Sequence, residues 1–377
     1  MRLAVCTGAS VRKSDPLLHT PHIGMLCNHA DDVRPRRFIG ETSFSLIGDA
    51  NMNDPFLTRR NFLIASAAAS VAVLPPMPAR GEEALRGKIR KAMIIGAVTE
   101  NALAPLKEAG FEGVESQNYH ITEEQGVRAR KHADDAGMRI HSVMRGWAEF
   151  NSDDPKKLEA SIEETRQSMR AAKWYGADDI LLVPCRIGGM PMPDPADFNI
   201  EFDEKTGHVS RVVDGDNSKF EAYIAAQNKA TDMSKAAVEK LIPLAEELKI
   251  TIALENVWNN LWVQPKLYKN FVASFNHPYV KSYFDVGNHV KYRKTPVHEW
   301  IPILGSLIVR LHFKGYKLGE TTKEDQWVHL RDGDSIDWKA VRKALSDVNF
   351  DGWASIEEGG LPFAEFNRRF DLIIAGK

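Results

Sequence analysis

The sequence predicts an α/β fold, a parallel (β/α)8 TIM barrel, and three observations lead to this prediction. From Lys88 onward, eight short apolar segments of strand type alternate with longer segments whose apolar residues recur at helical spacing. This alternation fills residues 88–377, close to the length of about 250 residues that is typical of such a barrel. Polar residues end the last four strands, where this fold builds its sites. A doubly wound open sheet is the alternative, but no Gly-x-Gly-x-x-Gly turn follows the first strand.

The composition is that of a globular protein. Of the 377 residues, 43% are hydrophobic and 27% are charged, which excludes wholesale disorder. The 49 basic and 51 acidic residues leave a net charge of −2, so no global basic field exists to hold nucleic acid or an anionic membrane. Three cysteines without a Cys-x-x-Cys pair exclude a disulfide scaffold and a thiolate zinc site.

The first 80 residues have the layout of an export signal. Thr58-Arg59-Arg60-Asn61-Phe62-Leu63 begins an apolar segment, residues 62–74, that ends in a proline-rich, small-residue exit. This segment is shorter than the roughly 20 residues that a membrane-spanning helix needs. The arginine pair resembles the bacterial twin-arginine signal, which implies a periplasmic or secreted protein. We therefore predict a signal peptide over residues 52–80, and residues 1–51 as a disordered extension or a stretch upstream of the true start at Met52.

The mature chain then supplies the elements of the barrel in order. The predicted strands are Ala92–Ala97, Gly113–Ser116, Arg139–Val143, Asp179–Pro184, Thr251–Asn256, Lys281–Asp285, Val309–Lys314 and Trp353–Glu357. Among the intervening segments, Lys156–Tyr175 and Asp232–Leu248 have the clearest helical periodicity.

One connection is much longer than the others. Residues 186–220 follow the fourth strand and contain glycines, prolines and a hairpin-like stretch at residues 202–207. Structureless loops of this length are uncommon and often functional. We predict a flap over the open end of the barrel, with a surface insertion of no function as the equal alternative.

Alternation along the last strands places polar side chains on the inner face of the barrel. In a strand, successive side chains point to opposite faces, and the apolar face must pack on the outer helices. Glu255 lies opposite Ile252 and Leu254 on this basis. Likewise, His312 shares its face with Arg310 and Lys314, and Glu357 shares its face with Ser355.

Four of these strand-end residues form a ligand set for one divalent cation. Singly, each would more often cap a loop, pair with a neighbouring charge or pack in the core. Together, three carboxylates and one imidazole suit Mn²⁺, Mg²⁺, Co²⁺ or Zn²⁺. A dication also removes the repulsion that clustered carboxylates would otherwise suffer. The predicted ligands are Glu255, Asp285, His312 and Glu357.

The order of short motifs around these residues resembles that of a known superfamily. Leu-Glu-Asn, Phe-Asp-Val-Gly-Asn-His, His-x-Lys and Asp-Gly-Trp-x-Ser-Ile-Glu follow one another as in the xylose-isomerase-like barrels, and residues 110–115 resemble their second strand. The resemblance covers roughly residues 91–370. It implies the same four metal ligands. The second histidine of the superfamily's epimerases usually follows the strand-6 aspartate by three positions, whereas His289 follows Asp285 by four.

The resemblance implies an enzyme, a metal-dependent sugar isomerase or epimerase, and the predicted export signal makes it a secreted one. Its chemistry is proton transfer beside a carbonyl through a metal-stabilised enediolate, with Glu255 and Glu357 as the catalytic pair. A keto-sugar or cyclitol dehydratase or lyase on the same scaffold is the alternative, and a non-catalytic sugar-binding barrel is a lesser one. An AP-endonuclease is disfavoured, because its additional metal-binding histidines are missing at most strand ends and the net charge of −2 does not suit a basic DNA groove.

The predicted partner is a small-molecule carbohydrate. A homo-oligomer is compatible with the fold, but nucleic acid and a stable membrane anchor are not expected. The candidate substrate-binding residues are His289, Lys314, His141, Arg186, Glu115 and Trp258. For each of them, a structural role (a strand cap, an ion pair or core packing) is the competing interpretation. Two neighbours are assigned structural roles: Cys185 has no base partner in the sequence, and Arg310 is expected to neutralise buried carboxylates.

Overall fold

The computed structural model describes residues 84–377. The predicted signal peptide, residues 52–80, and the stretch before it, residues 1–51, lie outside the described residues. Within residues 84–377, no helix combines the length and the apolar character that a membrane crossing requires.

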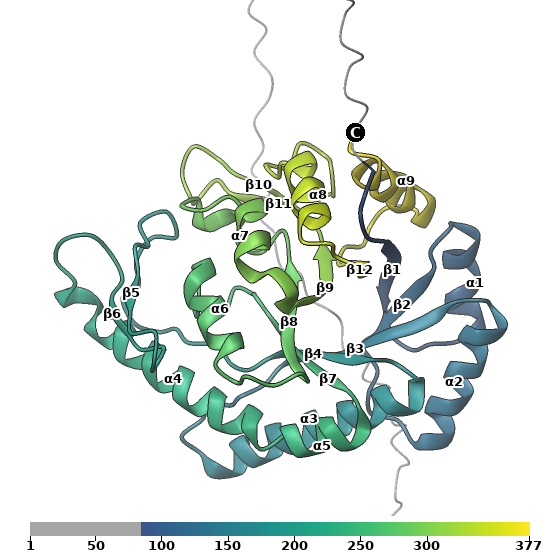
Figure 1. Cartoon of the computed structure of the whole chain (residues 1–377), viewed down its shortest axis with the longest axis horizontal. Helices are drawn as coiled ribbons and strands as arrows, with labels where there is room; N and C mark the ends of the chain where they lie inside the picture. The colour runs from purple at the N-terminus through teal and green to yellow at the C-terminus, as the bar shows by residue number, and fades with distance from the viewer. Residues whose placement is uncertain (1–83) are drawn as a thin grey trace, which may run out of the picture. The chain divides into compact units, whose positions relative to one another are not determined.

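Eight parallel strands close into a barrel (Figure 1). Around the barrel, the order is β1-β12-β9-β8-β7-β4-β3-β2, and the first and last strands of this order also pair. The barrel strands are β1 (Ile89–Ile95), β2 (Gly113–Ser116), β3 (Arg139–Trp147), β4 (Asp179–Val183), β7 (Thr251–Glu255), β8 (Val280–Asp285), β9 (Ile308–Phe313) and β12 (Gly352–Ile356). The predicted (β/α)8 fold is therefore confirmed, and each predicted strand overlaps one of these.

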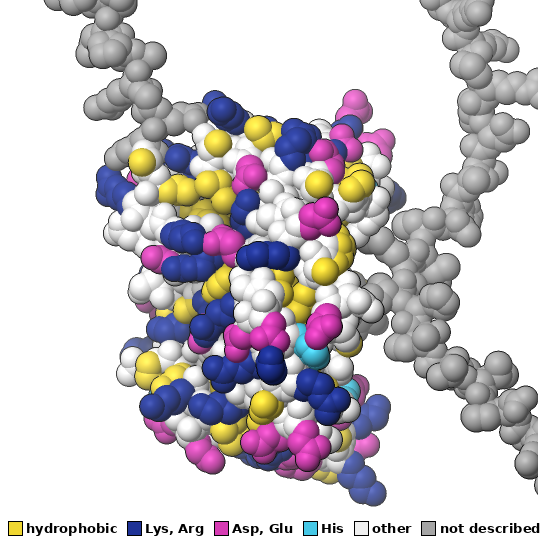
Figure 2. All heavy atoms as spheres, turned by 90° about the vertical axis from the view of Figure 1, so that its right-hand side faces the viewer, with side chains coloured by type: hydrophobic (Ala, Val, Ile, Leu, Met, Phe, Trp, Pro, Cys, Tyr) yellow, Lys and Arg dark blue, Asp and Glu magenta, His cyan; other side chains and the backbone are white. Residues whose placement is uncertain are grey.

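Helices flank the strands on the outside of the barrel. They are α1 (Glu100–Glu108), α2 (Glu123–Asp135), α3 (Pro155–Tyr175), α4 (Glu221–Glu239), α5 (Ile242–Leu248), α6 (Pro265–Ala273), α7 (Val297–Leu304), α8 (Trp338–Asp347) and α9 (Phe363–Ile374). Short 3-10 helices are η1 (Ser218–Phe220), η2 (Val290–Tyr292) and η3 (Gly305–Leu307). On the face that Figure 2 shows, Lys and Arg side chains are interspersed with Asp and Glu.

The predicted helix Asp232–Leu248 is wrong as a single element. The chain instead forms the end of α4 and a separate helix, α5, with a break at residues 240–241. Pro243 lies in the first turn of α5. A proline has no N–H to donate and is tolerated in the first turn of a helix but not in its interior, so it starts a new helix here.

Strand alternation divides the buried apolar residues into two sets. Ile252 and Leu254 of β7 belong to the large core that includes the helices, whereas Ala253 between them packs inside the barrel with Leu181 and Val183. The inner face of β7 is therefore the face that carries Ala253 and Glu255, as the sequence predicts. The carboxyl-terminal end of the barrel, called the mouth below, is where the inner polar side chains gather.

The long connection after β4 contains an antiparallel hairpin of β5 (Glu201–Phe202) and β6 (Val209–Arg211). This hairpin packs on the outer helices: Val209 exchanges hydrogen bonds with Asn228 of α4, and Asn270 of α6 donates to the Glu204 carbonyl. The hairpin therefore lies beside α4 (Figure 1) rather than over the mouth. Near the start of the connection, Asp194 accepts a hydrogen bond from Thr322 in the loop between two further short strands, β10 (Gly315–Lys317) and β11 (Gln326–Val328).

Candidate metal centre

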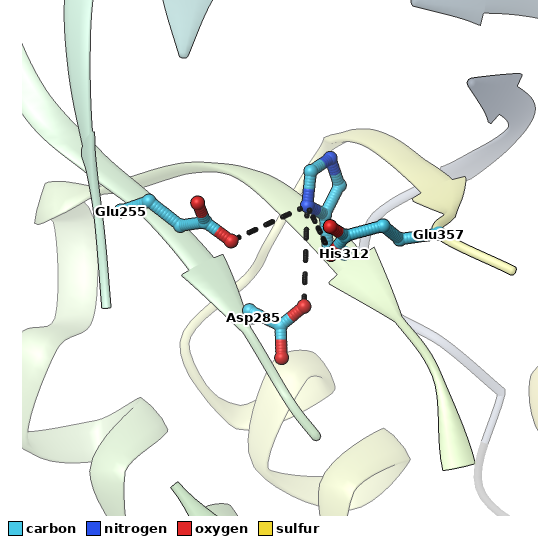
Figure 3. A group of neighbouring side chains, drawn as sticks. All are labelled: Glu255, Asp285, His312 and Glu357. Atoms are coloured by element: carbon cyan, nitrogen blue, oxygen red, sulfur yellow. Dashed lines mark ion pairs between the residues drawn. The ribbon is translucent and has the colours of Figure 1, made fainter. Parts of the chain in front are cut away.

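The four predicted metal ligands come together at the mouth. Glu255 and Asp285 end β7 and β8, His312 lies in β9, and Glu357 directly follows β12. These strands are neighbours in the barrel, and Asp285 and His312 are paired in register. One ligand atom from each of the four residues lies within 4.8 Å of the others (Figure 3).

The imidazole of His312 lies among the three carboxylates. Its Nδ1 atom is 3.2 Å from Glu357 Oε2, 3.6 Å from Glu255 Oε1 and 3.9 Å from Asp285 Oδ2. His312 and Asp285 are fully buried. Within residues 84–377, neither His312 Nδ1 nor Asp285 Oδ2 has a partner in hydrogen-bond geometry, although the Lys314 ammonium lies 3.2 Å from Asp285 Oδ2 as an ion pair. Buried polar atoms are rarely left without a hydrogen-bond partner, and a divalent cation would satisfy both. The residues present thus fit the predicted metal.

The electrostatics of the cluster agree with this fit. Burial raises the pKa of Asp285 to about 7, and it also raises the pKa of Glu255. Burial would likewise raise the pKa of Glu357, but the neighbouring Lys314 ammonium and His312 lower it below its ordinary value. Burial therefore disfavours the ionised forms of Asp285 and Glu255, and a bound dication would offset that unfavourable free energy.

Glu115 of β2 holds the other side of the His312 ring. His312 Nε2 lies 2.8 Å from Glu115 Oε2, which also accepts a hydrogen bond of 2.7 Å from the Tyr283 hydroxyl. Ser142 Oγ donates to the second oxygen at 3.3 Å. A proton on Nε2 that is donated to Glu115 leaves the Nδ1 lone pair directed at the carboxylate cluster. The predicted substrate contact of Glu115 does not fit this environment, because Glu115 is fully buried and both of its oxygens have partners.

We expect Glu115→Gln to weaken the affinity for a divalent metal by about 10- to 100-fold, the usual effect of losing such a partner. The glutamine amide can donate to His312 Nε2, which would favour the tautomer with its proton on Nδ1. Calorimetric titration with Mn²⁺ measures the affinity directly. Ser142→Ala is the matched control, because it removes only the longest bond to Glu115. An unchanged affinity in Glu115→Gln would contradict this positioning role.

Two asparagines of the site were not among the predicted residues. Asn288 donates from Nδ2 to Glu255 Oε1 at 3.2 Å and from its backbone N–H to Asp285 Oδ1 at 2.5 Å. Asn256 holds the Asp285 backbone on both sides, accepting from its N–H and donating to its carbonyl. Asn288 occupies the position three residues after Asp285, where the resemblance places a histidine, so the spacing was the signal that could have revealed it.

His289 turns away from the cluster. It is buried against Trp300 of α7 and Tyr292 of η2, with ring centroids 4.6 and 5.1 Å away. Its Nδ1 atom lies 3.2 Å from Asn256 Nδ2, and burial lowers its pKa to about 3, which keeps it neutral. The predicted substrate contact of His289 is therefore replaced by packing between the barrel and its outer helices.

His141 lies below the site rather than at a strand end. The strand β3 continues four residues beyond the predicted end, so His141 is only its third residue. Its ring is buried, stacks on Trp353 at 5.0 Å, and lies 2.9 Å from Ser355 Oγ. A substrate at the mouth would not reach this layer, which corrects the predicted role. Arg310 forms the expected buried ion pair, 2.5 Å from Asp179.

Lys314 does lie at the site. Its ammonium nitrogen is 2.6 Å from Glu357 Oε2 and 3.2 Å from Asp285 Oδ2. Burial opposes its charge, but these carboxylates raise its pKa above the ordinary value. On its other side, the ammonium lies 5.0 Å from the ring centre of Trp327 in β11. Lys314 is therefore a fixed cation next to the predicted ligands.

Trp258 contacts two residues near the predicted ligands, Asn288 and Trp327. Its indole N–H donates to the Asn288 carbonyl. Its ring stacks on Trp327 at 4.7 Å, and the Lys291 ammonium lies 4.0 Å from its centre. The ring and the N–H of Trp258 thus already have protein partners, and its substrate contact stays a prediction.

Arg186 and Cys185 follow β4 with opposite environments. Arg186 is exposed, and its guanidinium carbon lies 4.1 Å from the ring centre of Trp147 at the end of β3. Cys185 is buried 3.2 Å from Ser234 Oγ, and burial raises its pKa to about 12, as a structural role requires.

Comparison with known proteins gives a family match and several structural matches. The sequence profile of the xylose isomerase-like TIM barrel family matches residues 103–365. A D-tagatose 3-epimerase-like protein superposes with a TM-score of 0.56 at 15% identity, over 76% of this chain and 97% of that one. D-psicose 3-epimerase from Clostridium cellulolyticum H10 gives 0.55 at 13%, over 76% and 98%. The 3-keto-D-glucoside 4-epimerase from E. coli gives 0.53 at 12%, over 76% and 99%. No curated protein sequence matches the chain.

Proposed function

The chain belongs to the xylose isomerase-like TIM barrel family, and we propose that it is a metal-dependent sugar isomerase or epimerase. The similar structures include epimerases named for D-tagatose, D-psicose and a 3-keto-D-glucoside. Free ketoses and keto-glycosides are accordingly the proposed substrates. The proposed reaction removes a proton from a carbon beside a carbonyl group and returns one.

One observation supports this reaction most directly. Glu255 and Glu357 reach the cluster from opposite sides, with His312 and Asp285 between them (Figure 3). Their strands, β7 and β12, are separated in the barrel by β8 and β9. Two carboxylates placed in this way address the two faces of a planar carbon. One takes the proton from one face and the other delivers a proton to the opposite face, which inverts that carbon.

The remaining residues of the site orient the substrate and the catalytic pair. A divalent cation held by the four ligands would bind the carbonyl and neighbouring hydroxyl oxygens and stabilise the negative charge that develops on them. Asn288 fixes one oxygen of Glu255. Lys314 already donates to Glu357 at 2.6 Å, and its ammonium group has further N–H donors for a substrate oxygen that binds beside Glu357.

The experiment that tests the proposal is a screen in deuterated water. Mn²⁺-loaded protein is incubated with D-tagatose, D-psicose, D-fructose and 3-keto-glucosides, and the products are resolved by mass. We expect one deuterium at carbon in a product that is otherwise an isomer of the substrate. Loss of water or of an aglycone would instead assign the lyase reaction. The absence of carbon-bound deuterium from every sugar would contradict proton transfer altogether.

We also propose that the protein is exported by the twin-arginine route. The proposal rests on Arg59, Arg60 and the apolar segment after them. Export of an already folded chain suits a protein whose metal must be loaded before secretion. Replacing both arginines with lysine is expected to keep the protein in the cytoplasmic fraction, as measured by immunoblotting of cell fractions. Unchanged export of this variant would contradict the route.

A further inference from the structure

The two halves of the barrel mouth differ in chemistry. The predicted metal ligands come from β7, β8, β9 and β12. Inside the barrel, an apolar cluster also includes Ala253 and Tyr283 of β7 and β8, but the members next to the other half of the mouth are Leu181 and Val183 of β4, which are buried, and Met144 of β3 and Val257 after β7, which are partly buried. These four residues are called the apolar floor below, and the partly buried Met144 and Val257 are the ones that a substrate held at the ligands could contact.

Trp147 stands at the far edge of this floor. It is paired in register with Val183, and paired residues in neighbouring parallel strands point to the same face. Since Val183 packs inside the barrel, Trp147 also lies on the inner face, at the last position of β3. Trp147 is nevertheless 44% exposed; the other large exposed hydrophobic residue in the described chain is Val127 of α2. An indole thus faces solvent at the rim of the mouth.

Arg186 packs on this exposed indole, so that a charged side chain and an apolar one lie side by side at the rim. Its guanidinium lies against the Trp147 ring, at a distance of 4.1 Å, at the end of the neighbouring strand β4. A guanidinium stacked on an aromatic ring keeps its N–H donors in the plane, where they are free to bond hydroxyl groups. Such a pair suits a sugar ring, which has a C–H face for the indole and hydroxyl groups at its edge.

The strand order fixes how this pair relates to the metal ligands. Three strands separate β3 from β9 in either direction around the barrel, so Trp147 lies across the mouth from His312. The other aromatic side chains near the ligands are less suited to hold a ring, because Trp258 and Trp327 stack on each other and on lysine ammonium groups.

We propose that Trp147 and Arg186 bind a second sugar ring, which makes the substrate a glycoside rather than a free monosaccharide. This inference rests on the proposed function, because it takes the reacting ring to be held at the four metal ligands. The reacting keto-sugar ring lies at the ligands, the glycosidic bond crosses the apolar floor, and the linked ring stacks on Trp147 with its hydroxyls toward Arg186.

Paired substrates and paired variants test this assignment. The substrates are 3-keto-glucose, the disaccharide in which the same ring is linked to glucose, and its phenyl glycoside. The variants are Trp147→Ala and Trp147→Phe, which keeps an aromatic face. Val127→Ala is the control, because Val127 is also an exposed hydrophobic residue but lies on helix α2. For each, kcat/KM and calorimetric binding of the disaccharide are measured on Mn²⁺-loaded protein.

We expect the wild type to prefer the disaccharide, and Trp147→Ala to lower that preference by about three- to tenfold, mainly through KM. Trp147→Phe should retain most of the preference, and Val127→Ala should match the wild type. The assignment would be overturned if the wild type did not prefer the disaccharide to 3-keto-glucose, or if Trp147→Ala kept that preference unchanged. A stronger preference for the phenyl glycoside would also overturn it, because the pair would then bind an apolar aglycone rather than a sugar ring. If no sugar is turned over, the proposed function fails, and the binding of the disaccharide to wild type and Trp147→Ala still decides this inference.

Discussion

Glu255→Gln and Glu357→Gln are each expected to lower the turnover of the sugar substrate by about 10²- to 10⁴-fold, the range that a general acid or base contributes. A glutamine keeps the length of the side chain and one acceptor oxygen, so Asn288 and Lys314 retain their hydrogen bonds to these positions. It cannot take up or release the proton. The two variants should therefore remain folded while the reaction stops.

Exchange with solvent deuterium separates the roles of the two carboxylates. The variant that has lost the returning acid should still exchange the substrate's C–H proton with deuterium, because the base on the other face is intact. The variant that has lost this base should show neither exchange nor product. Assays in deuterated water, analysed by NMR, distinguish these outcomes for each substrate direction.

Both residues are also predicted ligands, so the metal content of each variant must be measured alongside its turnover. Glu358→Gln is the matched control, because Glu358 follows Glu357 but bonds to the backbone of Gly315 and Leu330 rather than to the cluster. It should retain turnover within about tenfold. Full turnover in Glu255→Gln with its metal bound would contradict the assignment of Glu255 as a proton carrier.

The sequence carried enough information for the fold and for the four ligands because both depend on strand periodicity. Apolar alternation fixes which face of β7 points inward, and that face must contain Glu255. Closure of the barrel then brings the ends of neighbouring strands together. The break between α4 and α5 was missed because helical spacing continues across it, whereas Pro243 starts a second helix.

The roles around the ligands were less predictable, since they depend on contacts between residues far apart in the chain. Glu115 acts on His312 from β2, 197 positions away, and no local pattern reveals that contact. His141 was misplaced because the end of β3 is marked by a bulge near Gly146 rather than by a change in apolar pattern. Asn288 takes the place at the site that was predicted for His289, because one position in the turn after β8 decides which side chain faces the mouth.

Asp285→Asn is expected to abolish the effect of metal on stability. For the metal-free wild type, a divalent ion at 100 times its dissociation constant should raise the free energy of unfolding by about 2.7 kcal/mol. In the variant, one charged ligand is lost, but the Oδ1 acceptor for the Asn288 N–H and both backbone bonds to Asn256 remain. Thermal unfolding with and without Mn²⁺ should therefore show a shift in the wild type only.

In the metal-free protein, Asp285→Asn should leave the stability of the fold unchanged or raise it. Burial raises the pKa of Asp285 to about 7, above the value of a free carboxyl, so the folded state binds the proton more tightly than the unfolded state does. This carboxyl therefore lowers the stability of the metal-free fold as pH rises from about 4 to about 7, and the penalty is complete above that range. Asparagine carries no such penalty; Lys314 loses its 3.2 Å ion pair with Asp285 but keeps the shorter one, 2.6 Å, with Glu357.

Metal-free Asp285→Asn should accordingly unfold at the same temperature as metal-free wild type or a higher one, with a difference that grows over that pH range. Adding Mn²⁺ should reverse the order, because only the wild type gains binding energy. A loss of stability in the metal-free variant, or an equal shift of both proteins by Mn²⁺, would mean that Asp285 serves the fold rather than a cation. The reversal of sign is the sharper test, since a merely damaging substitution would destabilise the protein under both conditions.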